Sequence, residues 1–479
     1  MNPSLLKNLG TAVRRPWIRS FSITAASLSD HHFKLLVVGG GSGGCAVASR
    51  FTRSLDPGDV GIVEPADSHF YQPMWTLVGA GLKTLEQSRK PMRNVLPKKA
   101  TWIQDQIISF DPDISTVWTV AGRQITYQYM VVAMGLQLNY SRIPGLVNAL
   151  QNDDRVCSNY SQKYVTKTFP AIQELKSGNA LFVFPNSPIK CAGAPQKIMY
   201  LADWILKKEG RRSNVNIIYL TPLPVLFGVK KYCEALEKIV AERNIRTVKE
   251  TELVRVNHHK SEAVFNNLKD GSTEAIEYSF LHVPPPMSAP DPLKDAPTGF
   301  TDATGFLNVS KNTLQHLKYP NIFGIGDCTN LPCAKTAAAA ATQVGVLFQN
   351  LQSVMEGESA SIAKYEGYTS CPLLVGYNKC IMAEFDYDLQ PLETFPVDQS
   401  IPRFSMYLLK KDIMPQLYWH LMTKGYWTGP GPARRLMHLQ FIKAFHTETK
   451  DKNEWTENTT DVAQNYQRTL KRIKRSSVR

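Results

Sequence analysis

The chain has 479 residues, of which 43% are hydrophobic and 20% are charged, so it is a globular protein that is too long for a single hydrophobic core. The formal net charge of +14 indicates an anionic partner, which could be nucleic acid, a membrane surface or a small anionic substrate. Zinc-finger spacing and RNA-binding aromatic motifs are missing, so no nucleic-acid partner is expected.

The first predicted segment is a presequence over residues 1–30. It contains several serines and other small residues, and no acidic residue precedes Asp30. Its basic residues are Lys7, Arg14, Arg15 and Arg19. This composition is typical of a mitochondrial transit peptide, and the alternative is a disordered basic arm.

A dinucleotide-binding turn is predicted directly after the presequence. Residues 34–44 read KLLVVGGGSGG, an apolar strand that leads straight into a GxGxxG pattern. The glycines of the pattern are Gly39, Gly41 and Gly44. Glycine permits the tight turn, the close approach of the backbone to a pyrophosphate, and the packing of helix on strand. A second strand over residues 60–63 ends at Glu64, an acid suited to a ribose hydroxyl pair, although a glycine-rich turn without a ligand is the alternative.

Two later segments favour FAD as the dinucleotide. Residues 129–135 read YMVVAMG and end at Gly135, and residues 321–327 read NIFGIGD and end at Asp327. The three elements in this order resemble glutathione-reductase-like flavoproteins with two dinucleotide-binding domains. The resemblance implies an α/β fold with a discontinuous FAD domain over residues 31–150 and 289–405. It also implies that FAD is held by Gly39, Gly41, Gly44, Glu64, Gly135 and Asp327.

The middle segment, residues 151–288, is predicted to be a second Rossmann-like domain without a nicotinamide site. Its first strand runs into a loop with prolines instead of glycines, and proline lacks the N–H that a pyrophosphate would accept from. The prolines are Pro185, Pro188 and Pro195. The second strand ends at Leu220 and Thr221, with no acid for a ribose. The reductant is therefore expected to be something other than NAD(P)H.

The eight cysteines are scattered and form no CxxC pair, so neither a zinc site nor a secreted disulfide framework is predicted. Cys191 stands where the phosphate loop of the middle domain would be, and Cys371 lies 180 residues later. A single cysteine in a sequence is most often a small buried apolar residue. The two thiols can act together only if the fold brings both to the flavin.

Six segments of the chain resemble the mitochondrial sulfide:quinone oxidoreductases, over about residues 33–442. They are HFYQPMWTLVGAG (69–81), PIKCAGAPQKIMYL (188–201), FGIGDCTNLP (323–332), TSCPL (369–373), AEFDYDLQPLETFP (383–396) and MYLLKKDIMPQLYW (406–419). Bacterial members often carry a further redox cysteine in the first flavin-domain segment. No cysteine lies between Cys45 and Cys157, so this chain is similar to the two-cysteine branch.

This resemblance implies that Cys191 and Cys371 form the redox pair, bridged directly or through one sulfane sulfur, with Sγ atoms about 2–4 Å apart. Hydrosulfide would leave a persulfide on Cys371 and free Cys191 to face flavin C4a. FAD would pass two electrons to ubiquinone, and a small acceptor, glutathione or sulfite, would take the outer sulfur. Lys197 and Lys410 are candidates for lowering the thiolate pKa or stabilising reduced flavin, unless they are solvated surface lysines.

Amphipathic helices that associate with the inner mitochondrial membrane are predicted over residues 406–445. Methionine, leucine, tyrosine and tryptophan alternate there with basic residues, and GYWTGPGP (425–432) separates two helices. A domain-packing or dimer-packing helix pair is the alternative. No stretch of the chain reaches the ~18 apolar residues of a membrane-spanning helix. Residues 446–479 are expected to be a disordered basic tail.

Two other functions are compatible with the pattern. A type II NADH:quinone oxidoreductase shares the fold and the quinone, but it requires the second GxGxxG that is missing here. A flavoprotein of the apoptosis-inducing type, which binds partners or DNA through its basic surface, would show strongly salt-dependent DNA binding without sulfide turnover.

Overall fold

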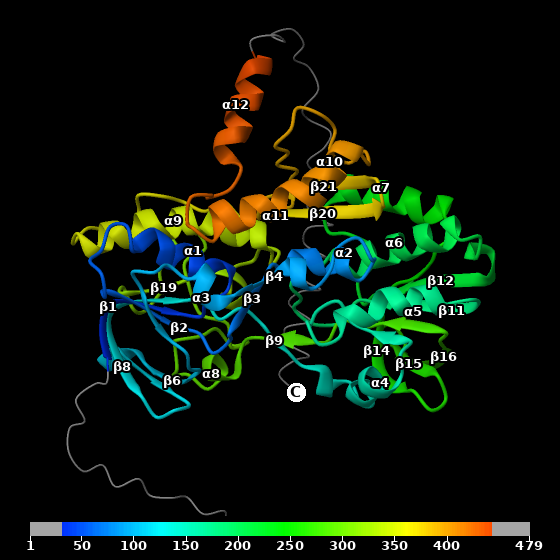
Figure 1. The fold of residues 1–479 in the computed structure, drawn as a ribbon, viewed down its shortest axis with the longest axis horizontal. Coiled ribbons are helices and arrows are strands. Elements are labelled where there is room, and N and C mark those ends of the chain that lie inside the picture. The colour runs from blue at the N-terminus through cyan, green and yellow to red at the C-terminus, as the bar shows by residue number, and fades with distance from the viewer. Residues whose placement is uncertain (1–30, 443–479) are drawn as a thin grey trace, which may run out of the picture.

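The structure, a computed structural model, describes residues 31–442. The predicted presequence of residues 1–30 and the predicted tail of residues 446–479 lie outside the described residues. Within them, two sheets stand side by side with helices on their faces (Figure 1).

The first sheet is built around β1 (His31–Val38), which pairs in parallel with β2 (Val60–Val63) on one side and β8 (Gln124–Val132) on the other. Leu35 to Val38 are all buried, as expected for a central parallel strand covered on both faces. The remaining strands are β5 (Thr101–Ile103), β6 (Ile107–Asp111), β7 (Thr116–Thr119) and β19 (Ile322–Gly324). β19 pairs in parallel with β8, so a segment almost 200 residues later in the chain completes this sheet.

Two helices that pack on each other cover the glycine turn of the first sheet. α1 (Ser42–Phe51) follows the turn directly, and α9 (Ala337–Met355) follows β19. The Thr336 hydroxyl caps α9 by accepting from the Ala339 N–H at 3.0 Å. The alanines of the first turns of α9 bring its backbone close to the cavity described below.

The second sheet has the order β10–β17–β11–β12–β13, and all neighbouring strands are parallel. Its strands are β10 (Val156–Cys157), β11 (Gly178–Val183), β12 (Val215–Leu220), β13 (Arg246–Val248) and β17 (Phe280–His282). α6 (Ala194–Lys208) and α7 (Lys230–Glu242) follow β11 and β12. The chain therefore has the predicted α/β fold with two Rossmann-like sheets.

The smaller elements connect or flank the two sheets. An antiparallel meander comprises β14 (Thr251–Asn257), β15 (Glu262–Asn267) and β16 (Thr273–Glu277). The short strands are β3 (Ser68–Phe70), β4 (Arg89–Pro91), β9 (Gln137–Leu138) and β18 (Met287–Ser288). The short helices are α2 (Trp75–Val78), α3 (Met92–Val95), α4 (Leu146–Asn152), α5 (Thr168–Glu174) and α8 (Asp291–Lys294).

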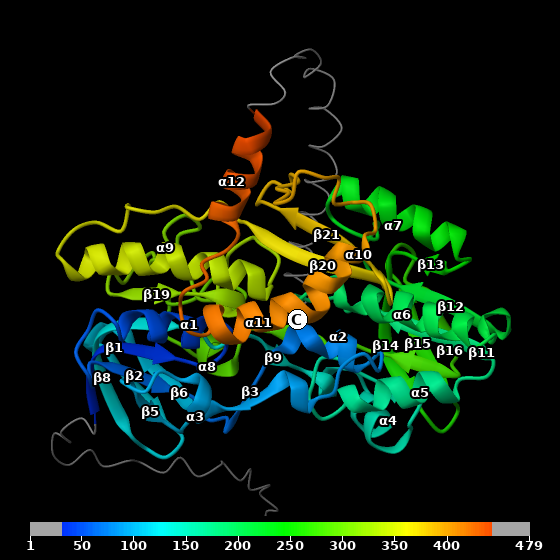
Figure 2. The same cartoon turned by 45° about the horizontal axis from the view of Figure 1, so that its top comes forward.

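A buried hairpin of β20 (Thr369–Gly376) and β21 (Lys379–Phe385) packs against α6 and α9. The helical run after it comprises α10 (Phe404–Leu408), α11 (Met414–Leu417) and two π-helical turns, and α12 (Gly431–Ile442) then projects from the body in both views (Figures 1 and 2). The break between the two helical segments therefore ends at Pro430, two residues earlier than predicted. Gly431 and Pro432 begin α12, because proline is tolerated in the first helical turn.

The helical run between residues 404 and 422 has apolar side chains on two faces. One set is buried against the body: Met406, Tyr407, Tyr418, Trp419 and Met422. Another set is exposed: Phe404, Leu408, Ile413 and Leu421. Of the helices in residues 31–442, none has both the length and the apolar character needed to span a bilayer.

Candidate active site

The turn between β1 and α1 has a backbone that only glycine fits at two positions. Gly39 has φ +102°, and a Cβ there would lie 2.5 Å from the Ala133 carbonyl oxygen. A Cβ on Gly44 would lie 1.8 Å from the Gly39 oxygen, so Gly44 allows α1 to pack against the turn. No atom lies within 4 Å of a Cβ built on Gly41, so the backbone there is open to a ligand.

A cavity of about 340 Å³ opens at this turn and extends to the middle domain. Five of the six predicted cofactor residues line it: Gly39, Gly41, Glu64, Gly135 and Asp327. Gly44 does not line it, because it lies one turn deeper in α1. Cys191 and Lys197 line the opposite part of the same cavity. The fold therefore brings the glycine turn, the Gly-Asp segment and one candidate thiol to a single space.

The donors around this cavity suit a dinucleotide. The N-terminus of α1 has no side-chain cap, so its first N–H groups are available to a pyrophosphate. Glu64 accepts from the Gly40 and Ala66 N–H groups at 2.7 and 2.8 Å while it lines the cavity. Burial raises the pKa of Glu64, and these two N–H groups oppose that shift. Burial also raises the pKa of Asp327, against the charges of Lys335 and Lys190.

The two candidate thiols meet beside the cavity. The Sγ atoms of Cys191 and Cys371 lie 3.9 Å apart, within the expected 2–4 Å. The Lys197 ammonium donates to Cys191 Sγ at 3.2 Å. A Cβ on Gly193 would lie 2.6 Å from Cys371 Sγ, so the thiols can approach only because residue 193 is glycine. The contact joins the loop before α6 to strand β20.

Cys191 is held by both Rossmann-like units. Its φ of +53° lies in the left-handed region, which is uncommon for a residue with a Cβ. Its N–H donates to the Lys335 carbonyl at 2.8 Å, and its own carbonyl accepts from the Tyr160 hydroxyl at 3.2 Å. These bonds maintain the strained backbone that directs the thiol to the cavity. The thiol pair therefore lies at the N-terminus of α6, beside the N-cap residue Gly193.

The electrostatics make the two thiols different. The hydrogen bond from Cys371 lowers the pKa of Cys191 well below its ordinary value, against burial, and the charges of Lys197 and Lys410 add to this. The same hydrogen bond, followed by burial, raises the pKa of Cys371 well above its ordinary value. The Lys197 ammonium, which donates to Cys191, favours the thiolate at Cys191 over Cys371.

Both candidate lysines are buried, so the alternative of solvated surface lysines is wrong. Lys197 is 2% exposed and Lys410 is 3% exposed. Burial lowers the pKa of Lys197, but the sulfurs of Cys191 and Cys371 raise it above its ordinary value overall. Lys410 donates to the Pro73 carbonyl at 3.0 Å, and burial, followed by repulsion from Lys197, lowers its pKa to about 8.

The other cysteines have the environment of packing residues. All eight cysteines lie within residues 31–442, and Cys191 is the one of them whose pKa is lowered. Cys328, which follows Asp327, is fully buried with its Sγ near the Ile325 and Val132 carbonyls. Burial raises the pKa of Cys328 to about 11. The thiols with raised pKa values are Cys45, Cys157, Cys233, Cys328, Cys333, Cys371 and Cys380.

A second cavity of about 190 Å³ lies next to the first, and Ala337 lines both. Its wall is largely apolar and comes from α9, the β20–β21 hairpin and the C-terminal helices. The polar side chains in the wall are Tyr71, Tyr368, Ser370, Glu384, Thr394 and Tyr418. Sequence reasoning missed this cavity, because these residues come from distant segments. The one signal was that Tyr368 and Ser370 closely precede Cys371 in the chain.

Comparisons with known proteins found similar sequences and a similar fold. The model of the pyridine nucleotide-disulphide oxidoreductase family matches residues 33–345. A Mus musculus protein named "Sulfide:quinone oxidoreductase, mitochondrial" is 51% identical over 87% of this chain and 92% of its own. The Dictyostelium discoideum protein of the same name is 42% identical over 83% and 87%. The solved sulfide:quinone oxidoreductase of Aquifex aeolicus shares the fold, with a TM-score of 0.67 at 20% identity over 88% of this chain and 98% of that one.

Proposed function

Since this chain belongs to the mitochondrial sulfide:quinone oxidoreductases of the pyridine nucleotide-disulphide oxidoreductase family, we propose that Cys191 and Cys371 oxidise sulfide beside bound FAD. Membership of the family makes the chain a flavin-dependent oxidoreductase with sulfide and quinone as substrates. The observation that carries the assignment is the thiolate–thiol pair with Lys197 at the edge of the dinucleotide cavity.

We assign FAD to the larger cavity. Its pyrophosphate would meet the N–H groups of α1 and the open backbone at Gly41, and its ribose and ribityl hydroxyls would meet Glu64 and Asp327. When bound, FAD supplies a two-electron acceptor that can later reduce a quinone. We propose the domain division at residues 31–150 and 289–405, with 151–288 between them. Its support is that the strands of the first sheet fall in the two outer segments and those of the second sheet fall in the middle one.

The thiols divide the sulfur chemistry between them. Hydrosulfide attacks the Cys371 sulfur of the bridged pair, the bond toward Cys191 breaks, and a persulfide forms on Cys371. Cys191 leaves as a thiolate, which Lys197 stabilises. Closing the bridge again, with the outer sulfur retained between Cys191 and Cys371, would release two electrons and two protons, and bound FAD would be the electron acceptor. A small acceptor, glutathione or sulfite, would then take that sulfur and restore the direct bridge. The observed 3.9 Å is a contact between two free cysteines, so the two sulfurs must come closer together when a bridge of either kind closes.

The cations at the thiols favour anionic reactants. Lys190 and Lys197 line the same cavity as Cys191, and burial lowers the pKa of Lys190 to about 8. Hydrosulfide and sulfite both carry negative charge at neutral pH, so these ammonium groups concentrate them near the sulfurs.

We assign the quinone ring to the second cavity and ubiquinone as its natural form. The cavity is apolar, and its shared wall at Ala337 places it beside the flavin site. Tyr418 and Met422 line it from the C-terminal helical run, whose other face is exposed and apolar. That face would lie on the inner mitochondrial membrane, which dissolves the quinone tail.

The substrate assignment has a direct test. Under anaerobic conditions, sulfide is expected to bleach the flavin absorbance of the purified enzyme within one turnover, and NADH is expected to leave it unchanged. The physical reason is that the loop after β11 carries Cys191 and prolines in place of a phosphate-binding glycine turn. Bleaching by NADH but not by sulfide would favour a type II NADH:quinone oxidoreductase instead.

The membrane assignment predicts a defect in lipid binding without a defect in sulfide oxidation. The double variant Ile413→Glu with Leu436→Glu places two charges on side chains that are 50% and 62% exposed. We expect at least a tenfold loss of binding to vesicles in a flotation assay, because each carboxylate would enter the bilayer interface. Bleaching of the flavin by sulfide is expected to be unchanged.

Ile114→Glu is the matched control. Ile114 is 60% exposed in the turn after β6, and β6 lies far from α12 in both views (Figures 1 and 2). Its substitution is expected to leave vesicle binding intact. Wild-type flotation of the double variant would contradict the assignment of this face to the membrane.

A further inference from the structure

The β20–β21 hairpin separates the thiol pair from the second cavity. Successive residues of a strand point to opposite faces, and residues paired across two strands share a face. Cys371 pairs with Ala383, and the Cys371 side chain points toward Gly193 before α6. Ser370 pairs with Glu384 and so points the other way, and both line the second cavity. One hairpin thus presents a thiol to the flavin site and a carboxyl group to the cavity assigned to quinone.

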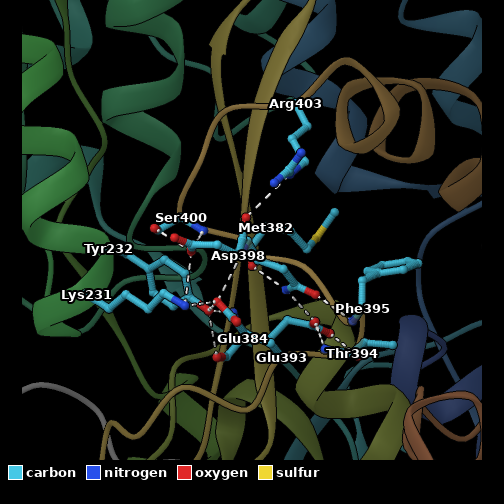
Figure 3. A network of polar contacts seen from close by, with 11 residues as sticks. Lys231, Tyr232, Met382, Glu384, Glu393, Thr394, Phe395, Asp398, Ser400 and Arg403 are labelled. Carbon is cyan, nitrogen blue, oxygen red and sulfur yellow. Dashed lines mark hydrogen bonds and ion pairs between the residues drawn. The ribbon is translucent and has the colours of Figure 1, made fainter. Parts of the chain in front are cut away.

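Glu384 is a buried carboxyl group whose four hydrogen-bond donors are all neutral. Figure 3 shows Glu384 beside one of the donor residues, Thr394. Its Oε1 accepts from the Tyr368 hydroxyl at 2.5 Å and from the Thr394 hydroxyl at 2.8 Å. Its Oε2 accepts from the Thr394 N–H and from the Gln399 side-chain amide, each at 2.8 Å. These donors hold the carboxylate in place, and none of them is a cation that would neutralise its charge.

Tyr368 connects this carboxyl group to the cavity. Its hydroxyl bonds to Glu384, and its side chain forms part of the cavity wall. Burial, followed by the adjacent carboxylate, raises the pKa of Tyr368 well above its ordinary value, so the hydroxyl retains its hydrogen. The Arg434 guanidinium lies 4.8 Å from the centre of its ring and covers this pair from α12.

The network extends from Glu384 to the surface (Figure 3). The Gln399 N–H donates to Glu393 at 3.3 Å, and Glu393 pairs with Lys231 at 2.8 Å. Lys231 also pairs with Asp398 at 3.0 Å, and both of these side chains reach solvent. A solvent-accessible acid, Glu393, therefore lies two hydrogen bonds from the buried one through Gln399.

We propose that Glu384 and Tyr368 deliver a proton to the quinone bound in the second cavity. This inference rests on the proposed function, which places quinone there. Reduction of a quinone needs two electrons and two protons. The electrons and one proton come from the reduced flavin, and the second proton comes from this pair. The Tyr368 O–H bond breaks as an O–H bond forms on the quinone oxygen, and Tyr368 regains its hydrogen from the protonated Glu384. Glu384 is left as a carboxylate and takes up a proton from solvent.

The test compares two electron acceptors on the sulfide-reduced holoenzyme. Glu384→Gln and Tyr368→Phe are each expected to slow reoxidation of the flavin by ubiquinone-1 about tenfold or more, because each removes a transferable proton. Ferricyanide accepts electrons without protons, so reoxidation by ferricyanide is expected to be unchanged. The dissociation constant of ubiquinone-1 for the oxidised enzyme is expected to change less than about threefold, and the solvent deuterium isotope effect on wild-type quinone reduction is expected to disappear in Tyr368→Phe.

Tyr232→Phe is the matched control, because Tyr232 donates to the main-chain carbonyl of Glu384 in the same network but does not line the cavity. It is expected to reduce ubiquinone-1 at the wild-type rate. Equal slowing with quinone and ferricyanide, or wild-type rates in both variants, would overturn the proposal. Should Glu384→Gln fail to fold, Tyr368→Phe alone decides, since it keeps the carboxylate. If wild-type flavin is not bleached by sulfide or not reoxidised by quinone, the proposed function itself is wrong.

Discussion

Cys191→Ser and Cys371→Ser are each expected to abolish reduction of the flavin by sulfide, with a loss of at least about a thousandfold in the anaerobic rate. Exchange between a persulfide and a thiolate requires two sulfurs within reach, and the two Sγ atoms lie 3.9 Å apart. A serine hydroxyl at either position can neither form the bridge nor leave as a thiolate. Stopped-flow absorbance of the flavin after mixing with sulfide measures the effect.

The remaining six cysteines are the internal controls. Serine at any of them is expected to leave the rate largely intact, with stability losses of about 1 kcal/mol where the thiol is buried. The control positions are Cys45, Cys157, Cys233, Cys328, Cys333 and Cys380. Cys328→Ser is the most stringent of these controls, because Cys328 follows Asp327, which lines the cavity assigned to FAD. If Cys328→Ser stops turnover and Cys371→Ser does not, the assignment of the pair is wrong.

Lys197→Met is expected to slow reduction of the flavin by sulfide about a hundredfold near neutral pH, with recovery as the pH rises. Lys197 lowers the pKa of Cys191 through its charge and its 3.2 Å hydrogen bond, so its loss raises that pKa. A thiol is deprotonated above its pKa. The deficit should therefore be largest at low pH and should shrink as the pH passes the new, higher pKa. The rate of bleaching measured between pH 6 and pH 9 shows this directly.

Lys410→Met is the matched comparison for Lys197→Met. Both lysines are buried, and both lower the pKa of Cys191 by their charge, but Lys410 bonds to the Pro73 carbonyl and not to the sulfur. We expect a smaller rate deficit with the same sign of pH dependence. A Lys197→Met enzyme whose deficit does not change with pH would contradict the role of Lys197 in stabilising the thiolate.

The sequence by itself determined the elements whose signals are local. An apolar strand followed by GxGxxG specifies a turn that only glycine can adopt, and the structure places Gly39 and Gly44 in such a turn. The prolines after residue 184 likewise exclude a second glycine turn without reference to the rest of the chain. Backbone conformation and hydrogen bonding within a few residues decide such features, so they can be predicted from neighbouring residues alone.

Only the tertiary structure decided what these elements bring together. Cys191 and Cys371 are 180 residues apart, and they meet because α6 packs on β20 and because Gly193 has no side chain. From the sequence alone, Lys197 and Lys410 could not be distinguished from solvated surface lysines. Ser370 and Glu384 lie in segments that resemble the family, but the second cavity could not be predicted from them. The alternation of side chains along a buried hairpin assigns residues to faces only when the register and the neighbours of the hairpin are known. The apolar period of residues 404–422 likewise predicted a helical run, but packing against the body determined which of its faces is buried and which is exposed.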